Sequence, residues 1–466
     1  MLTYNLEEND IPLYEQLYNH IKEDISNGVI KADEHLPSKR SFARHLGVST
    51  ITVENAYDQL ISEGYMYAIE KKGYYAADIS DIHKIKSSEI KRENIILPET
   101  PTDYQYDLSG NQVDTDTFPF SIWAKLLRET ISDDSDRLMR KSFCAGVEPL
   151  REAIAEHLAS FRGMSVDPNQ IIIGAGTEYL YSMLLLILGK DKRYCVENPG
   201  YKKILHIYRM NGADCTYVDM DEQGITVKGL NDKRADVAHI SPTHHFPTGI
   251  TMPVSRRYEL LAWANEVSGR YIIEDDYDSE FRLNGKPIPT LYSIDACGKV
   301  IYVNTFSKSL APTIRVSYMV LPVELANIYY ERFSFYSCTV SNFEQYTLAK
   351  FIKLGYFEKH INRMRLYYAR QRAKVMEALK KSSLYNSCNI IENNSGLHFV
   401  LELDTEYEDE VLKAKLAEKG VYMSAISEYL HGGKKKTDNS HRFILNYSNL
   451  DTDKLVEIFE IINYLI

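Results

Sequence analysis

The chain has 466 residues, enough for roughly two to four domains, and its 44% hydrophobic and 26% charged residues are typical of a globular protein. The formal net charge of −11 argues against a protein that coats nucleic acid nonspecifically, because such proteins carry a broad basic surface. The N-terminus lacks a secretory pattern, and the apolar run LYSMLLLILG is too short to span a bilayer. We therefore expect a cytoplasmic protein without a membrane partner.

The six cysteines lie far apart, with neither a C-x-x-C spacing nor a paired histidine. Because zinc sites and disulfide frameworks require such groupings, neither is expected, and no metal site is predicted. Buried thiols are the simpler interpretation.

Three helices are predicted near the N-terminus. In residues 13–28, apolar side chains recur every fourth position and Gly28 follows as a stop, which is typical of an amphipathic helix. The segment PSKRSFARHLG predicts a short second helix capped by Ser38. The segment STITVENAYDQLISEG predicts a third helix that buries Val53, Ala56, Tyr57, Leu60 and Ile61, and leaves Thr50, Ile51, Thr52 and Glu54 exposed near its start.

Two short β-prone pieces, YMYAIE and YYAAD, follow the third helix and are joined by KKG. This pattern predicts a hairpin wing, so residues 1–78 are expected to form a mainly α winged helix-turn-helix domain. Such a domain places the start of its third helix in the major groove of double-stranded DNA.

The charge of this domain is unevenly distributed. Residues 1–80 contain seven basic and thirteen acidic side chains, a net charge of −6. Five of the seven basic residues lie on the second helix or the wing, where they would flank a groove-bound third helix and meet phosphates: Lys39, Arg40, Arg44, Lys71 and Lys72. A three-helix module that binds another protein is the alternative.

Residues 12–65 resemble the GntR-type DNA-binding domain over nearly its whole length. The resemblance implies that DNA is contacted by the turn before the second helix, the start of the third helix and the wing glycine: Ser38, Arg40, Ser49, Thr50, Thr52 and Gly73. Many members carry arginine where this chain has Thr50. A threonine cannot make the bidentate guanine contact of an arginine, so the operator sequence stays open.

Residues 79–105 mix charges, serines and prolines with little periodicity, as expected of a linker. Beyond them, short apolar runs alternate with helical patterns, for example QIIIGAG before TEYLYSMLLLILG and RYCVEN before YKKILHIYRMNG. This alternation predicts an α/β domain over 106–466 whose mainly parallel sheet is covered on both faces.

Four pieces of this domain carry chemistry. In IIIGAGTEYL a helix begins directly after a strand, and its free N–H groups suit a phosphate, although Glu178 is an awkward neighbour for an anion. In YIIEDDYDSEF, carboxylates stand at the carboxyl end of a buried strand, where α/β sheets bind ligands.

The third piece is NTFSKSLAPTIRV. It places Lys308 after a strand, between Thr305 and Ser307, with Arg315 seven positions on. A desolvated amine can form a Schiff base with an aldehyde, and an arginine can hold a phosphate bidentately. The fourth piece, ENPGYKKI, offers the ring of Tyr201 for stacking on a flat ligand. Pyridoxal 5′-phosphate (PLP) needs this combination of groups.

This part of the chain resembles the fold-type I aminotransferases, through SK-x₆-R, EDDY and PTG. The resemblance implies a mainly parallel large domain and a smaller α+β C-terminal subdomain over about 325–466. It implies that Lys308 forms the Schiff base with PLP, that Asp275 faces the pyridinium nitrogen and that Tyr277 reaches the ring hydroxyl. The remaining cofactor contacts would come from Gly176, Thr177, Glu178, Tyr201, Thr305, Ser307 and Arg315.

A GntR-like reader joined to an aminotransferase-like domain is similar to the MocR/GabR-type regulators, which the phrases HHFPTGITMPVSRR and NSGLHFVLEL also resemble. In this chain Phe246 replaces the asparagine of the aminotransferase NPTG motif. The resemblance implies a homodimeric, PLP-dependent transcriptional regulator that senses an amino acid, an amine or PLP itself.

Two departures concern the effector. Members that bind amino acids usually grip the carboxylate with an arginine where this chain has Ile444, and Arg442, two residues upstream on the same strand face, is a candidate substitute. Lys203 stands where the γ-aminobutyrate sensors have an arginine. Two alternatives stay open: an active PLP-dependent aminotransferase with an accessory DNA-binding module, and a scaffold that has lost the cofactor.

Overall fold

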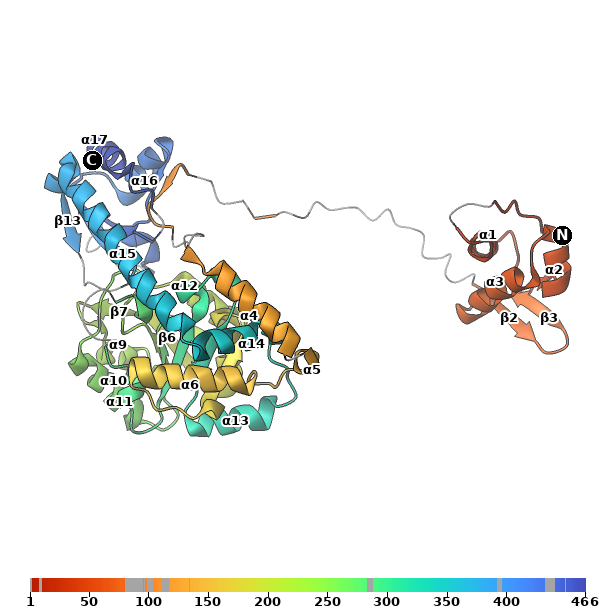
Figure 1. The fold of residues 1–466 in the computed structure, drawn as a ribbon, viewed down its shortest axis with the longest axis horizontal. Coiled ribbons are helices and arrows are strands. Elements are labelled where there is room, and N and C mark those ends of the chain that lie inside the picture. Colours follow the sequence, from red (N-terminus) through yellow and green to blue (C-terminus); the bar gives the residue numbers. More distant parts are fainter. Residues whose placement is uncertain are drawn as a thin grey trace. The chain divides into compact units, whose positions relative to one another are not determined.

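The computed structural model of the chain describes residues 2–7, 11–79, 95, 97–98, 104–110, 117–133, 135–282, 288–391, 396–431, 441–448 and 450–466. The chain separates into two compact units, Met1–Pro101 and Thr102–Ile466, coloured along the sequence in Figure 1. Most of the predicted linker, 79–105, lies outside the described residues. No helix in the described ranges is long and apolar enough to cross a membrane.

The first unit contains three helices and a three-stranded antiparallel sheet of order β1-β3-β2. The predicted helices and wing are confirmed, whereas the two-residue strand β1 is too short to give a periodic pattern in the sequence. The bounds are α1 Leu13–Ser26, β1 His35–Leu36, α2 Lys39–Leu46, α3 Thr50–Ser62, β2 Met66–Ile69 and β3 Gly73–Ala76.

Local chemistry sets the helix ends of this unit. The side chains of Ser38 and Ser49 accept hydrogen bonds from the backbone N–H groups of Ser41 and Thr52, so both helices begin with a serine cap. Gly47 ends α2 in the left-handed conformation, at a φ of 71° that a side chain would disfavour. The fully buried Tyr57 of α3 lies in the core that unites the three helices and the sheet.

The second unit is built on an eight-stranded sheet of order β5-β12-β11-β10-β9-β6-β7-β8. The five central strands β11, β10, β9, β6 and β7 pair in parallel with their neighbours in that order. Strand β12 pairs antiparallel with β11 and β5, and β8 pairs antiparallel with β7. The predicted mainly parallel sheet is therefore confirmed. The bounds are β5 Ile171–Gly174, β6 Arg193–Asn198, β7 Asp214–Asp221, β8 Gly224–Ile225, β9 Val237–Ile240, β10 Tyr271–Asp275, β11 Val300–Thr305 and β12 Ser317–Val320.

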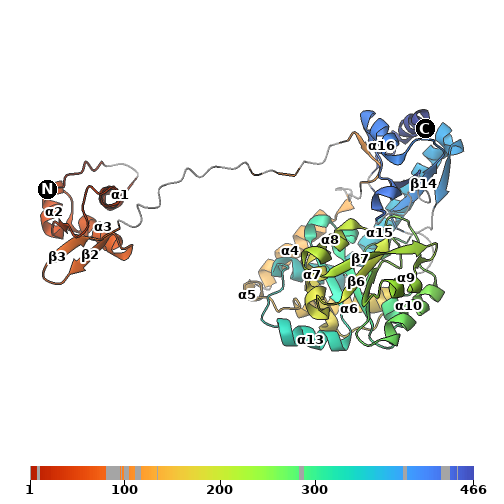
Figure 2. The same ribbon diagram turned by 180° about the vertical axis from the view of Figure 1, so that it is seen from behind.

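Helices cover this sheet, and α7 and α8 lie side by side in Figure 2. Two core clusters contain side chains of the central strands, one with α7 and α13 and the other with α10. The bounds are α4 Phe120–Asp133, α5 Ser135–Leu138, α6 Glu148–Arg162, α7 Thr177–Leu188, α8 Lys202–Met210, α9 Val227–Asp232, α10 Val254–Glu266, α11 Leu291–Ile294, α12 Phe306–Ser309, α13 Val323–Phe333 and α14 Asn342–Lys353, with single 3-10 turns at Pro168–Gln170, Ser279–Phe281 and Pro312–Ile314.

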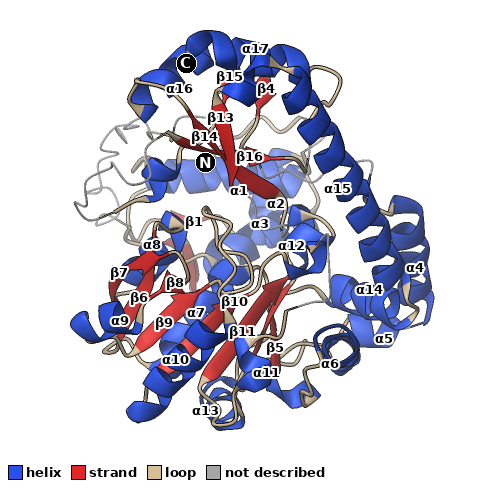
Figure 3. Cartoon of the chain, turned by 90° about the vertical axis from the view of Figure 1, so that its left-hand side faces the viewer, coloured by secondary structure: helices blue, strands red, loops and turns tan. Residues whose placement is uncertain are grey.

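The C-terminal part adds a small antiparallel sheet of order β13-β14-β16, and a two-stranded parallel pair, β15 with β4. The long helix α15 runs from this part to the helices α14 and α4 (Figure 3). The start of the smaller subdomain near residue 325 stays a prediction, and α13 at that position packs in the core cluster of the large sheet. The bounds are β4 Tyr106–Asp107, α15 Tyr356–Lys381, β13 Cys388–Ile391, β14 His398–Leu403, α16 Asp409–Glu418, β15 Val421–Tyr422, β16 Arg442–Asn446 and α17 Leu455–Leu465, with 3-10 turns at Ser383–Asn386 and Ile426–Tyr429.

Candidate cofactor and effector site

The strand directions bring the predicted site residues of the second unit to one edge of the large sheet. Strands β5, β6, β10 and β11 point the same way, so the segments that follow them meet at their carboxyl ends. A cavity of about 440 Å³ opens there, which is within the size range of small-molecule sites. Ten of the twelve residues predicted for this site line it, namely Thr177, Glu178, Tyr201, Lys203, Asp275, Tyr277, Thr305, Ser307, Lys308 and Arg315.

Asp275 closes β10, is buried and lines the cavity. One carboxylate oxygen, Oδ2, accepts a hydrogen bond of 2.5 Å from the hydroxyl of Tyr181, and the Nε2 of His239 lies 3.5 Å from it. The other oxygen, Oδ1, is buried and has no hydrogen-bond partner among the described residues. A buried carboxylate oxygen of this kind needs a donor, so it could accept a hydrogen bond from a ligand in the cavity.

Lys308 lies on α12, directly after β11. Burial lowers the pKa of its amine to about 8, against the opposing effect of the Asp278 carboxylate. An amine with this pKa is partly neutral near physiological pH, which a nucleophile toward an aldehyde requires.

The start of α7 forms a cradle of backbone and cations. Gly176 caps this helix with a φ of 90°, and a Cβ at this position would overlap the guanidinium of Arg315. Arg315 is itself in the left-handed conformation, at a φ of 53°. Nearby, the hydroxyl of Thr305 donates to the Oγ of Ser307 at 2.9 Å. Helix N-H groups, hydroxyls and an arginine together suit a phosphate.

Glu178 contacts the cations of this cradle. Its Oε2 accepts a hydrogen bond of 2.8 Å from Arg315, and its Oε1 forms an ion pair with Lys203. The hydrogen bond from Lys203 and the two nearby positive charges lower the pKa of the Glu178 carboxyl. The contact of Glu178 with the cofactor stays a prediction. A direct contact with the phosphate would be unfavourable, because a carboxylate repels a phosphate.

Tyr277 and Tyr201 differ in their surroundings. The hydroxyl of Tyr277 lies 3.2 Å from the Nδ1 of His244, which is also 2.8 Å from the Oδ2 of Asp278. Burial and the neighbouring carboxylates raise the pKa of Tyr277 well above its usual value, so its phenol stays protonated. Tyr201 is half exposed and meets the ring of Phe246 edge on, at 6.3 Å between centroids, which leaves a face available for stacking.

Arg442 is paired within the small sheet, and its role as a substitute carboxylate ligand stays a prediction. Its Nε donates to the Oε1 of Glu402 at 2.9 Å, and in the described part of the chain it lies outside the cavity lining. The pairing follows from register, because Arg442 of β16 stands opposite Glu402 of β14. Ile444, two residues along, is buried against Val400 and Ile426.

Sequence analysis missed several lining residues, including Tyr181, His239 and Glu197. Tyr181 lies four positions after Thr177 on α7, so helical spacing could have indicated it. His239 becomes visible only through topology, because it stands beside Ile273 on the neighbouring strand, two residues before Asp275. Burial raises the pKa of the Glu197 carboxyl to about 8, although nothing in its sequence context marks it.

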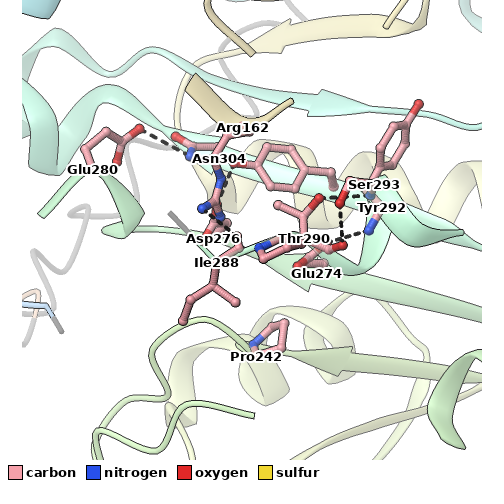
Figure 4. A network of polar contacts seen from close by, with 12 residues as sticks. Arg162, Pro242, Glu274, Asp276, Glu280, Ile288, Thr290, Tyr292, Ser293 and Asn304 are labelled. Atoms are coloured by element: carbon pink, nitrogen blue, oxygen red, sulfur yellow. Dashed lines mark hydrogen bonds and ion pairs between the residues drawn. The ribbon is translucent and has the colours of Figure 1, made fainter. Parts of the chain in front are cut away.

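A buried polar network lies beside the end of β10 (Figure 4). Arg162 of α6 forms an ion pair with Asp276, and both side chains are 1% exposed. The hydroxyl of Tyr302 also donates to Asp276, at 2.7 Å, and Arg162 donates to the backbone oxygen of Ile288. Glu274 accepts hydrogen bonds from two backbone N–H groups at 2.9 Å. The network thus fixes both neighbours of Asp275.

The predicted DNA contacts of the first unit fall into two groups. Lys39 is half-buried, and its Nζ lies 3.0 Å from Glu54 and 2.9 Å from Asp58, so this lysine is engaged within the unit. The side chains of Ser49 and Thr52 are hydrogen-bonded to each other at 2.8 Å. The other predicted contact residues are Ser38, Arg40, Thr50, Lys71, Lys72 and Gly73, all exposed except the half-buried glycine.

The fold and both sites now define a class of protein: a winged helix-turn-helix unit joined to a unit of the fold-type I aminotransferase architecture. Residues 13–75 match the bacterial regulatory proteins of the gntR family, and residues 104–462 match the family described as aminotransferase class I and II. The chain belongs to both families, in the combination typical of the MocR-type regulators.

Named relatives align with this chain over most of their length. The HTH-type transcriptional regulator YdeL of Bacillus subtilis is 38% identical over 432 residues, which cover 92% of each chain. The probable rhizopine catabolism regulatory protein MocR of Rhizobium meliloti is 30% identical over 462 residues, covering 96% of this chain and 92% of that protein. A kynurenine aminotransferase structure from Pyrococcus horikoshii shares the fold, with a TM-score of 0.67 at 24% identity, and covers 83% of this chain and 97% of that one.

We predict that Arg162→Met strongly destabilises the second unit, because it leaves Asp276 as a buried charge without its partner. The expected loss in the free energy of unfolding is about 3–5 kcal/mol. Chemical denaturation of the full chain measures it, with Lys381→Met as control. Lys381 pairs with Glu377 at the surface, both 65% exposed, so the control should change stability by less than about 1 kcal/mol. Equal small effects of the two variants would contradict the role of the buried pair.

A second prediction concerns pH. The rate at which PLP modifies Lys308 should rise with pH and level off above about pH 8. The reason is that the amine loses its proton as the pH passes its pKa of about 8, and only the neutral amine attacks the aldehyde. Peptide mapping after reductive trapping measures the rate at each residue. Ordinary exposed lysines, with a pKa of about 10.4, provide an internal control whose rates continue to rise above pH 8. The same continued rise at Lys308 would contradict the lowered pKa.

Proposed function

We propose that this protein is a PLP-dependent transcriptional regulator, which binds operator DNA through its first unit and senses a small molecule through its second. The observation that carries the cofactor assignment is the joint presence in one cavity of the Lys308 amine, with its pKa of about 8, and the unpartnered Oδ1 of Asp275. PLP requires an amine for its aldehyde and an acceptor for its ring nitrogen.

When bound, PLP supplies an aldehyde and an electron-withdrawing ring for amine chemistry. Lys308 would hold it covalently, Arg315 and the start of α7 would bind its phosphate, and Tyr201 would stack on it. Asp275 would keep a proton on the ring nitrogen, with Tyr181 and His239 holding this carboxylate in place. Tyr277 would donate its hydroxyl proton toward the ring oxygen.

Regulation requires that a ligand bind two arrangements of the protein with different affinities, since a ligand that binds both equally shifts nothing. We propose that the regulator is a homodimer and that its ligand is an amine, an amino acid or PLP itself. The two DNA-binding units of a dimer would contact two half-sites of one operator, as in other dimeric helix-turn-helix proteins.

An active aminotransferase is the second candidate, because Lys308, Asp275 and Tyr277 supply the groups that amine exchange needs. Sustained production of a keto acid from an amino acid would favour the enzyme. A change in the visible absorbance of the loaded protein without turnover would favour the sensor. Protein that stays colourless at saturating PLP would support a scaffold without cofactor.

Lys308→Ala tests the sensing role. We expect the variant to fold and bind operator DNA with unchanged affinity, but to lose the visible absorbance of the loaded protein and the effect of small molecules on DNA binding. A gel-shift titration with DNA selected from a random library, with and without PLP and candidate amines, measures this effect. A retained response would remove Lys308 from the sensing mechanism.

Arg40→Ala tests the DNA interface. We expect the affinity for all DNA sequences to fall and the slope of log affinity against log salt to decrease by about one per binding unit, because one phosphate contact is lost. Lys31→Ala is the matched control, since this exposed lysine precedes β1 and lies outside α2 and the wing. Equal salt slopes for Arg40→Ala and the wild type would show that Arg40 does not meet phosphate.

A further inference from the structure

The cavity has an apolar wall besides its cofactor-binding groups. The rings of Tyr201, Phe246 and Tyr429 line it, and Phe246 meets Tyr429 edge on at 5.2 Å between centroids. Behind Phe246 and Tyr429 lies a small core of Val400, Ile426 and Ile444. A ligand tail next to this wall would be apolar, since polar groups buried there would lose hydrogen bonds to water.

The cationic side chains of the cavity are few, and Glu178 already pairs with two of them. The described lining of the cavity contains three cationic side chains, Lys203, Lys308 and Arg315. Glu178 pairs with both Lys203 and Arg315. If the proposed cofactor is bound, Lys308 is covalently used and a phosphate of about −1.5 to −2 charge occupies Arg315. Lys203 alone then faces both Glu178 and the phosphate.

A ligand carboxylate would therefore enter a site where the phosphate and Glu178 outweigh Lys203 and Arg315 in charge. Asp275 would be paired with the protonated ring nitrogen, and Arg442 is engaged by Glu402 outside the lining. A carboxylate that loses part of its hydration without gaining a cationic partner is disfavoured. A ligand that brings only an amine avoids this penalty, because its charge is opposite to that of the surrounding groups.

We propose that this site selects a primary amine with an apolar aromatic or aliphatic tail and without a carboxylate, and that Glu178 enforces the selection by neutralising Lys203. This inference rests on the proposed function, because it assumes that PLP occupies Lys308 and Arg315.

Matched pairs of ligands test the inference on the full chain loaded with PLP. 2-Phenylethylamine and L-phenylalanine differ by one carboxylate, as do n-propylamine and 4-aminobutanoate. Isothermal titration calorimetry and the visible absorbance of the loaded protein give the affinities. We expect each amine to bind at least tenfold more tightly than its carboxylate counterpart. Equal or tighter binding of the carboxylates, or no binding of either amine, would overturn the inference.

The variant Glu178→Gln isolates the role of Glu178. It releases Lys203 for a ligand carboxylate, so the preference for amines should shrink about tenfold. Glu152→Gln is the matched control, because Glu152 pairs with Lys353 at 2.9 Å with a similar exposed fraction, 42%, but outside the cavity lining. An unchanged preference in Glu178→Gln would overturn the role of Glu178.

The loading step separates this inference from the proposed function. A wild-type chain that acquires no visible absorbance with excess PLP, and that gives the same calorimetric result as Lys308→Ala, contradicts the cofactor assignment. A chain that loads normally but prefers carboxylates contradicts only the selection of amines.

Discussion

The candidate cofactor site depends on the direction in which the Asp275 side chain points from the end of β10. Neighbouring residues of a strand point to opposite faces, so Glu274 and Asp276 turn away from the cavity that Asp275 enters. Arg162 and backbone N–H groups bind those two neighbours in the interior. Because the interior network fixes the strand end, Asp275 can leave one oxygen unpaired toward a ligand.

The same site shows how charge is controlled. Lys308 is partly desolvated, which lowers the pKa of its amine to about 8, whereas Glu197 is fully desolvated, which raises the pKa of its carboxyl to about 8. Burial therefore acts on both groups in favour of their neutral forms. Charge persists where a partner is present, as in the contacts of Glu178 with Lys203 and Arg315.

The sequence predicted much of the fold and the lining of the site, because both depend on local patterns. Serine caps, glycine stops and strand runs located α2, α3, β10 and β11, and the residues after each strand then had to meet at one sheet edge. The pairings of Lys39 with Glu54 and of Arg442 with Glu402 could not be predicted. They depend on which elements pack together and in what register, which a single sequence does not show.

The engagement of Lys39 also changes the electrostatics expected of the DNA-binding unit. The net charge is −6 over residues 1–80, and two basic side chains, Lys22 and Lys39, are paired within the unit, so few cations remain for phosphates. The N-termini of α2 and α3, capped by Ser38 and Ser49, add partial positive charge, but this effect extends over only one turn. A single unit would therefore bind DNA weakly at physiological salt. Two units on one operator would double the phosphate contacts, so the proposed homodimer also meets an electrostatic requirement.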